Sequence, residues 1–493
     1  MEKLEAPPEK SLRAIADLLG EPCPDVDVLI HGLTNMSSQV EVGDLFLAFP
    51  GAKVHGAMFC MDARGRGASA VLTDLNGAGL ATGLPAIVTA NPRRAAGILS
   101  AWFYGEPMRD MFAVGITGTN GKTTTTTLLH QLWTSAGRQA GLIGTVETRI
   151  GKGVITSKRT TPESADLQRL IATMRERHVK NLAMEVSSHA ISLERVRGAH
   201  FSAVAFTNLS QDHLDFHHSM EEYFQAKAAL FTYEFADLAV INMDDPYGRR
   251  LAAACELPLL RISRHDGKAD WSFVSIHRQL RGNDVVIRGL GGILIEGTLP
   301  LHGDFNMDNA LMAVALAFES GIDPVEISAL LPQLTGALGR LEAVNLGQSF
   351  AAFVDYAHSP DSVIRVLQAC REMSDRRVIA VLGCGGDRDA SKRPLMGEAL
   401  VAGSDIAIFT SDNPRSEEPV AILREMTSRM EIAAPNRVIP DRKEAIEYAV
   451  SMAGSGDIVI VLGKGHETGQ EISGIIEPFD DRLVLAEAIE ARR

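Results

Sequence analysis

The stretch "GITGTNGKTT" contains residue types that bind phosphate, and it directly follows an apolar run. Gly118 and Gly121 allow a tight turn, whose backbone N–H groups attract an anion together with the N-terminus of a following helix. Lys122 supplies charge, and the hydroxyl of Thr123 can hold Mg²⁺. A standard loop of this kind has a further glycine where this chain has Ile116, so a chance Gly-Lys-Thr is the alternative. The strand-like run before the loop and the helical pattern after it favour a phosphate loop.

Two later apolar runs end in possible metal ligands. Glu185 closes "NLAME", and a carboxylate at a strand end could hold Mg²⁺ beside nucleotide phosphates. The segment "NLSQDHLDFHH" contains His213, Asp215, His217 and His218, whose spacing alone suits zinc or iron. A hydrogen-bonded loop without metal is a second interpretation. A supporting role at a Mg²⁺ site is the third, and it is favoured because the phosphate loop already implies Mg²⁺.

Lys227 stands among apolar residues in the helical stretch "MEEYFQAKAALF". From the pattern alone, we expect its stem to pack on apolar surface while its ammonium group reaches water. A desolvated lysine is more often neutral, however, and a neutral amine can react.

Charged motifs also follow the apolar runs near the C-terminus. In "TSDNPR", the planar guanidinium of Arg415 could grip a carboxylate through two parallel hydrogen bonds. An ordinary turn is the alternative for this motif alone, because Asn-Pro is common in loops. "GCGGDRD" is not a dinucleotide fingerprint, since Arg388 occupies the place of the third glycine.

Short strands must position these residues. Runs such as "MFAVGIT", "SAVAFTNLS" and "LAVINMDD" are apolar and end in polar residues, which is typical of parallel strands covered on both faces. The pattern restarts near residue 337 and predicts a second doubly wound unit. Ligands of such sheets bind beyond the carboxyl ends of the strands, where the motifs stand. We therefore predict an α/β protein with three domains: a smaller N-terminal α/β domain (1–108), a central P-loop-type parallel-sheet ATPase domain (109–336) and a C-terminal Rossmann-like domain (337–493).

Composition limits the classes of function. A formal charge of −14 argues against a general nucleic-acid binder, although a few local lysines and arginines suffice for an anionic substrate. No apolar run approaches the roughly 18 residues that cross a bilayer, and the N-terminal stretch has no apolar signal core. The five cysteines are scattered without a CxxC pair, as in reduced cytosolic proteins. We expect a cytoplasmic monomer without membrane insertion.

The variant loop "TGTNGKT" resembles that of the Mur ligases and folylpolyglutamate synthetases, which use ATP to join amino acids to a carboxylate. With "GDFNMDNALMA", "VDYAHSPDS", "GCGGDRDASKRPLM", "DNPR" and "GKGHE" in family order, essentially the whole chain resembles the diaminopimelate-adding Mur ligases of peptidoglycan synthesis. The resemblance implies addition of meso-diaminopimelate to the D-glutamate γ-carboxylate of UDP-MurNAc-L-Ala-D-Glu through an acyl phosphate. It also implies ATP, Mg²⁺ and roles in cell wall biogenesis, cell shape and cell division.

The resemblance assigns residues to each ligand. The implied ATP contacts are Gly118, Thr119, Asn120, Gly121, Lys122, Thr123, Thr124, Asn309, Arg340, Asp355 and His358. The implied contacts of the UDP-MurNAc-dipeptide are Ser37, Thr160, Thr161, Ser187 and Arg195. The implied diaminopimelate contacts are Arg388, Asp412, Asn413, Pro414, Arg415, Gly463 and Glu467. The implied catalytic residues are Lys122, Glu185, His213 and Lys227, and the implied metal ligands are Thr123, Glu185, His213 and Lys227. In this family the lysine at the position of Lys227 carries a CO₂-derived carbamate.

Several alternatives have distinct consequences. A P-loop ATPase or switch would hydrolyse nucleotide without an amino acid, and it leaves the DNPR motif without a role. A folylpolyglutamate synthetase would need neither the first domain nor that motif. For a lysine-adding Mur ligase, the substrate would leave Arg415 unpaired in a closed pocket, at a cost of roughly 1–3 kcal/mol or more. Intact Lys122, Lys227 and Arg415 argue against a non-catalytic scaffold.

Overall fold

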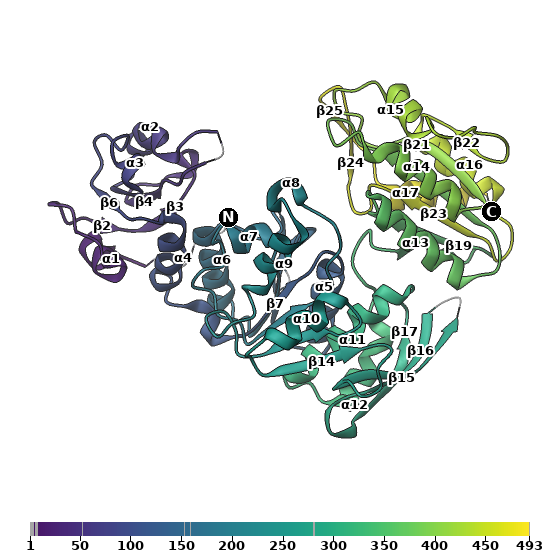
Figure 1. Ribbon diagram of the computed structural model, residues 1–493, viewed down its shortest axis with the longest axis horizontal. Coiled ribbons are helices and arrows are strands. Elements are labelled where there is room, and N and C mark those ends of the chain that lie inside the picture. Colours follow the sequence, from purple (N-terminus) through teal and green to yellow (C-terminus); the bar gives the residue numbers. More distant parts are fainter. Residues whose placement is uncertain are drawn as a thin grey trace. The chain divides into compact units, whose positions relative to one another are not determined.

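The computed structural model describes residues 4, 8–51, 53–151, 153–157, 159–279 and 282–492 (Figure 1). Contacts divide the chain into two compact units. The first comprises 1–273, 287–295 and 308–330, and the second 274–286, 296–307 and 331–493. Within the described residues, no helix has the length and apolar character needed to cross a membrane.

The N-terminal part of the first unit has its own parallel sheet. Its strands, in spatial order, are β3 (Gly32–Thr34), β4 (Asp44–Leu47), β5 (Ala70–Thr73) and β6 (Ala86–Val88). Leu45 and Leu47 pack toward α1 (Leu12–Leu19) and α4 (Pro92–Phe103), while Phe46 faces the side of α2 (Cys60–Arg66). Both faces of the sheet are therefore covered. The remaining elements are β1 (Lys10–Ser11), β2 (Leu29–Ile30), η1 (Ser37–Gln39), η2 (Gly56–Phe59), α3 (Leu75–Ala78) and η3 (Pro107–Asp110).

A second sheet follows, with β7 (Phe112–Thr117) in its interior. Its parallel strands run in the order β8 (Ala140–Ile143), β11 (Asn181–Glu185), β7, β12 (Ala203–Phe206), β13 (Ala239–Asn242) and β14 (Leu259–Ser263). Antiparallel β9 (Glu147–Ile150) and β10 (Gly153–Thr156) extend one edge, and β15 (Trp271–Gln279), β16 (Gly282–Arg288) and β17 (Leu294–Leu299) follow β14 in the strand order. The strands β9, β10, β15, β16 and β17 were not expected from the apolar runs.

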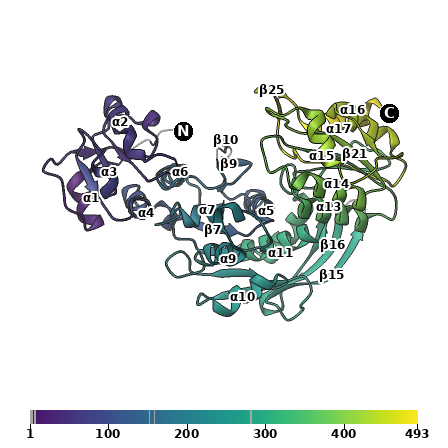
Figure 2. The same cartoon turned by 45° about the horizontal axis from the view of Figure 1, so that its top comes forward.

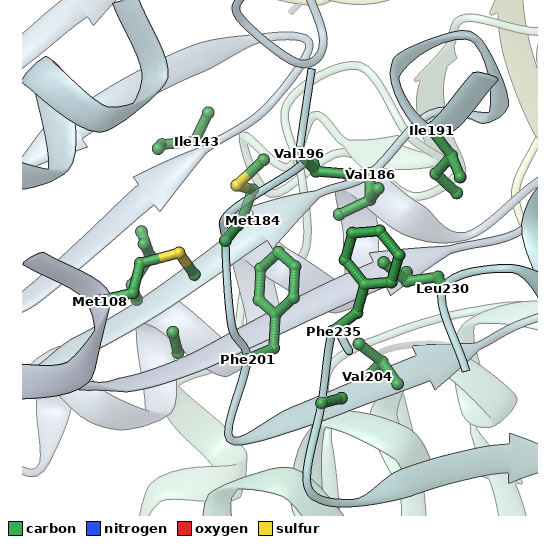
Figure 3. Close-up of a cluster of buried hydrophobic side chains, with 14 of the residues drawn as sticks. Met108, Ile143, Met184, Val186, Ile191, Val196, Phe201, Val204, Leu230 and Phe235 are labelled. Carbon is green, nitrogen blue, oxygen red and sulfur yellow. The ribbon is translucent and has the colours of Figure 1, made fainter. Parts of the chain in front are cut away.

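The core of this sheet accounts for its apolar strands. Phe201 and Phe235 belong to one buried cluster with Met184 of β11 and Val204 of β12 (Figure 3). Gly115 gives Phe201 room, because a Cβ atom there would lie 3.1 Å from its ring. The helices of this part are α5 (Lys122–Ser135), α6 (Ser164–Glu176), α7 (Ser188–Ser192), α8 (Leu214–His217), α9 (Met220–Ala228), α10 (Pro246–Ala254), α11 (Asp304–Glu319) and α12 (Pro324–Leu330), with η4 (Leu290–Gly292) and η5 (Leu331–Gln333).

The predicted second doubly wound unit is present. Its strands, in spatial order, are β18 (Glu342–Ala343), β19 (Ala351–Asp355), β23 (Ile458–Leu462), β20 (Val378–Cys384), β21 (Ile406–Ser411) and β22 (Arg437–Val438), all parallel except β18. One face carries α13 (Pro360–Met373), α14 (Lys392–Gly403) and α15 (Pro419–Met426), and the other α16 (Arg442–Met452) and α17 (Asp481–Ala491). Helices α13 and α14 lie side by side (Figure 2). The hairpin of β24 (Gly469–Ile472) and β25 (Ile475–Pro478) lies between β23 and α17 in the chain.

The predicted α/β class is confirmed, because each of the three predicted segments contains its own parallel-rich sheet. The boundaries after residues 108 and 336 stay predictions.

Candidate active site

The loop after β7 has the backbone geometry of a phosphate cradle. Gly118 has φ 147° and Gly121 has φ 86°, both positive. A Cβ atom would lie 1.8 Å from Thr207 Oγ1 at the first position and 2.3 Å from Asn309 Oδ1 at the second. Only glycine fits either position. Ile116 is a buried residue of β7 itself, so the site of the absent glycine belongs to the strand.

Helix α5 begins at Lys122, and Gly121 before it has no side chain that could cap the helix. The first N–H groups of α5, at the positive end of the helix dipole, therefore stay available to an anion. The Lys122 ammonium donates to the carbonyls of Gly118 and Thr119, at 2.8 Å each, which folds it over the loop.

The threonines that follow are packing residues. Thr125 Oγ1 donates to Asn309 Oδ1 at 3.3 Å, and Thr126 Oγ1 donates to the carbonyls of Lys122 and Thr123. These bonds offset the poor helix propensity of the run. Thr123 and Thr124 are buried in the first turn. Earlier in the loop, Thr119 Oγ1 donates to the Ser210 carbonyl and Asn120 N donates to Asn208 Oδ1.

Lys227 is buried, with 1% exposure, so the expectation that its ammonium reaches water is wrong. Its Nζ donates to the Gly118 carbonyl at 2.8 Å and lies 4.7 Å from the centre of the Tyr223 ring. Burial, and next the charge of Lys122, hold the pKa of Lys227 well below its ordinary value. Helix α9 therefore brings a second lysine to the same carbonyl as Lys122, and burial disfavours the charged form of its amine.

Glu185, at the end of β11, is buried and joined to the next loop. Its carboxylate accepts bonds from Thr145 N at 2.7 Å and Thr145 Oγ1 at 3.0 Å. The Thr145 hydroxyl also lies 3.0 Å from Thr160 Oγ1, and Thr161 Oγ1 donates to the Glu185 carbonyl. Since Glu185 pairs with Ile116 in the sheet, this network stands beside the phosphate loop.

His213 is half-exposed and has φ 53°. Burial lowers the pKa of His213, and the nearby charges of Lys122 and Lys227 act in the same direction. His217 is buried and shares a 2.9 Å hydrogen bond with Ser188 Oγ, and burial lowers its pKa to about 4. In the part of the chain that the structure describes, no group of three or more His, Cys, Asp or Glu side chains could hold a metal ion. The zinc or iron interpretation of this segment has no support.

Four predicted acceptor-binding residues come together near β11. Ser187 N donates to Thr161 Oγ1 at 3.1 Å, and Arg195 Nη1 donates to the Thr161 carbonyl at 3.4 Å. Thr160 joins them through Thr145. Arg195 also pairs with Glu163 at 2.9 Å. Ser37 lies elsewhere, on η1 beside the N-terminal sheet, where its side chain hydrogen-bonds Asp62 and lowers the pKa of that carboxyl.

The predicted ATP contacts fall in both units. The phosphate loop and Asn309 belong to the first, whereas Arg340, Asp355 and His358 cluster in the second. The Arg340 guanidinium stacks 4.7 Å from the Tyr356 ring, and His358 Nδ1 lies 2.8 Å from the Tyr356 carbonyl. Asp355 accepts bonds from Leu341 N and Ala357 N, and burial raises its pKa.

The loops after β20, β21 and β23 bring the predicted diaminopimelate contacts together. Arg415 Nη1 donates to the Gly386 carbonyl at 2.6 Å, beside the exposed Arg388. Asn413 Nδ2 donates to Glu467 Oε2 at 2.7 Å. These residues stand at the carboxyl ends of neighbouring parallel strands, as the sequence predicted.

Asp412, Asn413 and Pro414 are all buried. The Asp412 carboxyl points at Gly463, where a Cβ atom would lie 2.4 Å from Oδ2, and burial raises its pKa. These residues shape the loops from within, whereas Arg388, Arg415 and Glu467 remain at least partly accessible.

Comparison with known proteins identifies the family. Residues 116–317 match the Mur ligase middle domain, 339–465 the Mur ligase glutamate ligase domain, and 29–100 the catalytic domain of the Mur ligase family. A relative from Streptomyces coelicolor, named UDP-N-acetylmuramoyl-L-alanyl-D-glutamate--2,6-diaminopimelate ligase, is 48% identical over 97% of this chain and 96% of its own. The chain belongs to the Mur ligase family. A relative of the same name from Bacillus velezensis is 40% identical over 97% of this chain and 99% of its own.

Solved structures agree with the assignment of this chain to the Mur ligase family. One titled as UDP-N-acetylmuramoyl-L-alanyl-D-glutamate--2,6-diaminopimelate ligase is 30% identical, has a TM-score of 0.72, and covers 98% of this chain and 99% of its own. The MurF ligase from Thermotoga maritima in complex with ADP has a TM-score of 0.62 at 16% identity, over 97% of this chain and 100% of its own, which shows the shared fold alone.

Several residues of the Mur ligase site were not expected from the sequence. Lys464 is fully buried and donates to Asn413 Oδ1 and Glu467 Oε2, and Glu471 lies 3.5 Å from the Arg415 guanidinium. Thr145 links Glu185 to Thr160. Lys464 stands inside the motif "GKGHE", which could have marked it, whereas no local pattern distinguishes Thr145 or Glu471.

Proposed function

We propose that this Mur ligase uses ATP to add meso-diaminopimelate to the D-glutamate γ-carboxylate of UDP-MurNAc-L-Ala-D-Glu, a step of peptidoglycan precursor synthesis. Near full-length similarity to ligases named for this reaction supports the proposal. The structural observation that supports it is the turn at Arg415: its guanidinium binds the loop that contains Arg388, and Asn413 of the same turn binds Glu467.

The phosphate loop serves the first half of the reaction. A carboxylate is a poor acyl acceptor because its negative charge repels nucleophiles, so transfer of the γ-phosphoryl group of ATP makes an acyl phosphate and ADP. Lys122 and the N-terminus of α5 stabilise the charge on the transferring group. The Glu185–Thr145–Thr160 network and Arg195 hold the acceptor dipeptide next to this loop.

The second half needs the amino group of the diamino acid. Its lone pair attacks the acyl phosphate carbon, and the tetrahedral intermediate collapses to an amide with release of phosphate. Arg415 can accept the distant carboxylate of diaminopimelate in a bidentate contact, whereas lysine has no such carboxylate. Loss of this charged contact costs on the order of 1–3 kcal/mol, which corresponds to a preference of up to about 100-fold.

The residues around Lys227 also fit the Mg²⁺ and carbamate known from the family. Mg²⁺ takes few protein oxygens and keeps phosphate and water ligands, so the absence of a three-residue metal cluster among the described residues is compatible with it. Thr123, Glu185, His213 and carboxylated Lys227 would hold the ion, which supplies charge neutralisation at the phosphates. Carboxylation forms a bond from the neutral Nζ to CO₂ and releases a proton, converting a neutral amine beside Lys122 into an anion.

The carbamate has a direct test. Isotope-labelled bicarbonate should give a carbamate carbon signal in the wild-type protein by NMR, and Lys227→Met should lack it. A signal of equal size in both proteins would place the carbamate elsewhere.

The function itself is tested by phosphate release from ATP with UDP-MurNAc-L-Ala-D-Glu, comparing meso-diaminopimelate, L-lysine and no amino acid. We expect release with diaminopimelate only. Equal rates in the three reactions would reject the assignment. We further propose a cytoplasmic monomer, in keeping with five free cysteines, and size-exclusion chromatography with light scattering tests the oligomeric state.

A further inference from the structure

Two loops that carry the recognition arginines are locked to each other. The loop after β20 contains Gly386 and Arg388, and the loop after β21 contains Asn413 and Arg415. Gly386 N donates to the Asn413 carbonyl at 2.9 Å, and Arg415 Nη1 donates back to the Gly386 carbonyl at 2.6 Å. A Cβ atom at Gly386 would lie 1.9 Å from the Pro414 carbonyl oxygen, so the backbones touch without space for a side chain.

Both loops contain a strained residue. Asp387 has φ 52° and Arg415 has φ 54°, in the left-handed region that L-residues rarely adopt. Strained conformations of this kind persist only where the surroundings hold them. The positions of both guanidinium groups depend on these two turns, because Arg388 directly follows Asp387 in the chain and Arg415 is itself the strained residue of the second turn.

Glu417 contacts both turns, the one at Asp387 through its side chain and the one at Arg415 through its backbone N–H. Its Oε1 accepts a hydrogen bond from Asp387 N at 2.6 Å, and Glu417 N donates to the Pro414 carbonyl at 3.0 Å, which closes the turn containing Arg415. The Asp387 carboxylate in return accepts from Ser416 Oγ at 2.6 Å and Ser416 N at 3.2 Å. Asp387 and Glu417 thus bind each other's loop reciprocally.

Glu417 is itself held by a buried arginine. Arg393 donates to both carboxylate oxygens of Glu417 at 2.8 Å, and its side chain is 1% exposed. Arg393 also donates to the Gly385 carbonyl at 3.2 Å and to Glu425 at 2.7 Å. It extends from α14, whose Met396 and Leu400 are in the core of this unit, so the anchor is rigid.

We propose that Glu417, anchored by Arg393, is a positioning residue for the amino-acid substrate: it fixes the turns at Asp387 and Arg415 so that Arg388 and Arg415 converge on the same diamino acid. This inference rests on the proposed function. It assigns specificity to an ion pair that stands behind the arginines and does not itself touch substrate.

Glu425 provides a matched control for the ion pair. It binds the same arginine at 2.7 Å from helix α15, and it is about half exposed. Within residues 282–492, no hydrogen bond joins its side chain to either recognition loop. Loss of its charge therefore weakens the contact to Arg393 without releasing the loops.

The experiment compares Glu417→Gln with Glu425→Gln in the full-length enzyme. We expect Glu417→Gln to raise KM for meso-diaminopimelate on the order of tenfold, as for loss of a charged hydrogen bond, and to lower the preference over L-lysine. KM for ATP should stay within about twofold of the wild-type value. Glu425→Gln should leave both KM values and the preference unchanged. A purely structural role predicts equal loss of stability and kcat with every substrate in both variants.

Two outcomes separate this inference from the proposed function. If wild-type enzyme releases phosphate without regard to diaminopimelate, the proposed function fails. If the wild-type enzyme depends on diaminopimelate and Glu417→Gln keeps its KM, only the positioning inference fails. Should Glu417→Gln not fold, Ser416→Ala at an exposed position decides: we expect a smaller rise of KM for diaminopimelate, and an unchanged KM overturns the inference.

Discussion

Arg415 Nε lies 3.5 Å from Oε2 of Glu471, a residue of strand β24 in the hairpin β24–β25. The backbone reinforces the contact, because Arg415 N donates to the Glu471 carbonyl at 3.0 Å and Ser473 N donates to the Arg415 carbonyl at 2.6 Å. The residue proposed to recognise a substrate carboxylate therefore already faces a carboxylate of the protein. Glu471 both orients the guanidinium and competes with the substrate carboxylate for it.

Replacing Glu471 by glutamine should lower KM for meso-diaminopimelate. The pair is partly exposed, with side-chain exposures of 23% and 38%, so its strength is about 0.2–1 kcal/mol and the expected change is roughly two- to fivefold. The backbone bonds remain in the variant and keep the turn. Steady-state kinetics at saturating ATP and acceptor measure the effect. A raised KM would show that orientation by Glu471 outweighs competition.

Gly121→Ala should impair ATP binding. The new Cβ atom would lie 2.3 Å from Asn309 Oδ1, and φ 86° is unfavourable for alanine, so the loop must shift. We expect KM for ATP to rise on the order of tenfold or more. Gly65→Ala on α2 is the control, because no atom lies within 4 Å of a Cβ atom there. Nucleotide titration by fluorescence checks both variants, and equal affinity in both would mean that the loop is not the nucleotide site.

Two aspartates of the second unit should give opposite pH dependence of stability. Burial raises the pKa of Asp412 against the charge of Arg442. Between its unfolded and its raised folded pKa, the folded chain binds more protons, so the wild-type free energy of unfolding falls as pH rises. The Asp412→Asn variant lacks this titrating group. Its free energy of unfolding, relative to that of the wild type, should therefore increase with pH. The slope has a ceiling of about 1.4 kcal/mol per pH unit.

Asp457 provides the opposite case. Burial acts to raise its pKa, but hydrogen bonds from the Arg377 side chain and Gly454 N outweigh burial and lower it. The stability from this carboxylate is present above the unfolded pKa and is lost as pH falls through the folded pKa. Asp457→Asn should therefore be destabilised near pH 7 and approach wild type in acid. Urea titrations across pH measure both series, and parallel slopes for the two variants would contradict the prediction.

The sequence predicted where the motif residues stand in the strands, loops and helices better than how they are held. The order of strand, glycine loop and helix placed Lys122 correctly, because those features are local. From the apolar pattern alone, the Lys227 ammonium was expected to reach water, whereas the family resemblance implied a desolvated, reactive amine. Its burial depends on the loop after β7, which approaches α9 from more than 100 positions away in the chain.

The same limit applies to the C-terminal loops. Arg388 and Arg415 stand in recognisable motifs, and parallel strands put their loops at one edge. The contacts of Arg393 and Glu471 depend on which loops meet in space, and no periodicity encodes that. The antiparallel hairpin β9–β10 and the strands β15, β16 and β17 were missed because the apolar runs of the parallel strands dominated the pattern.

Arg415→Ala should mainly remove the preference for diaminopimelate over lysine. The substitution deletes the proposed partner of the distant carboxylate, which weakens diaminopimelate binding, whereas lysine has no such carboxylate and loses no such contact. We expect the ratio of kcat/KM values to fall by about 100-fold, with KM for ATP nearly unchanged. Arg415→Lys is the informative companion, because it keeps the charge but cannot form the bidentate contact. Its ratio should lie between those of wild type and Arg415→Ala. If both variants retain wild-type selectivity, the distant carboxylate is bound by another residue.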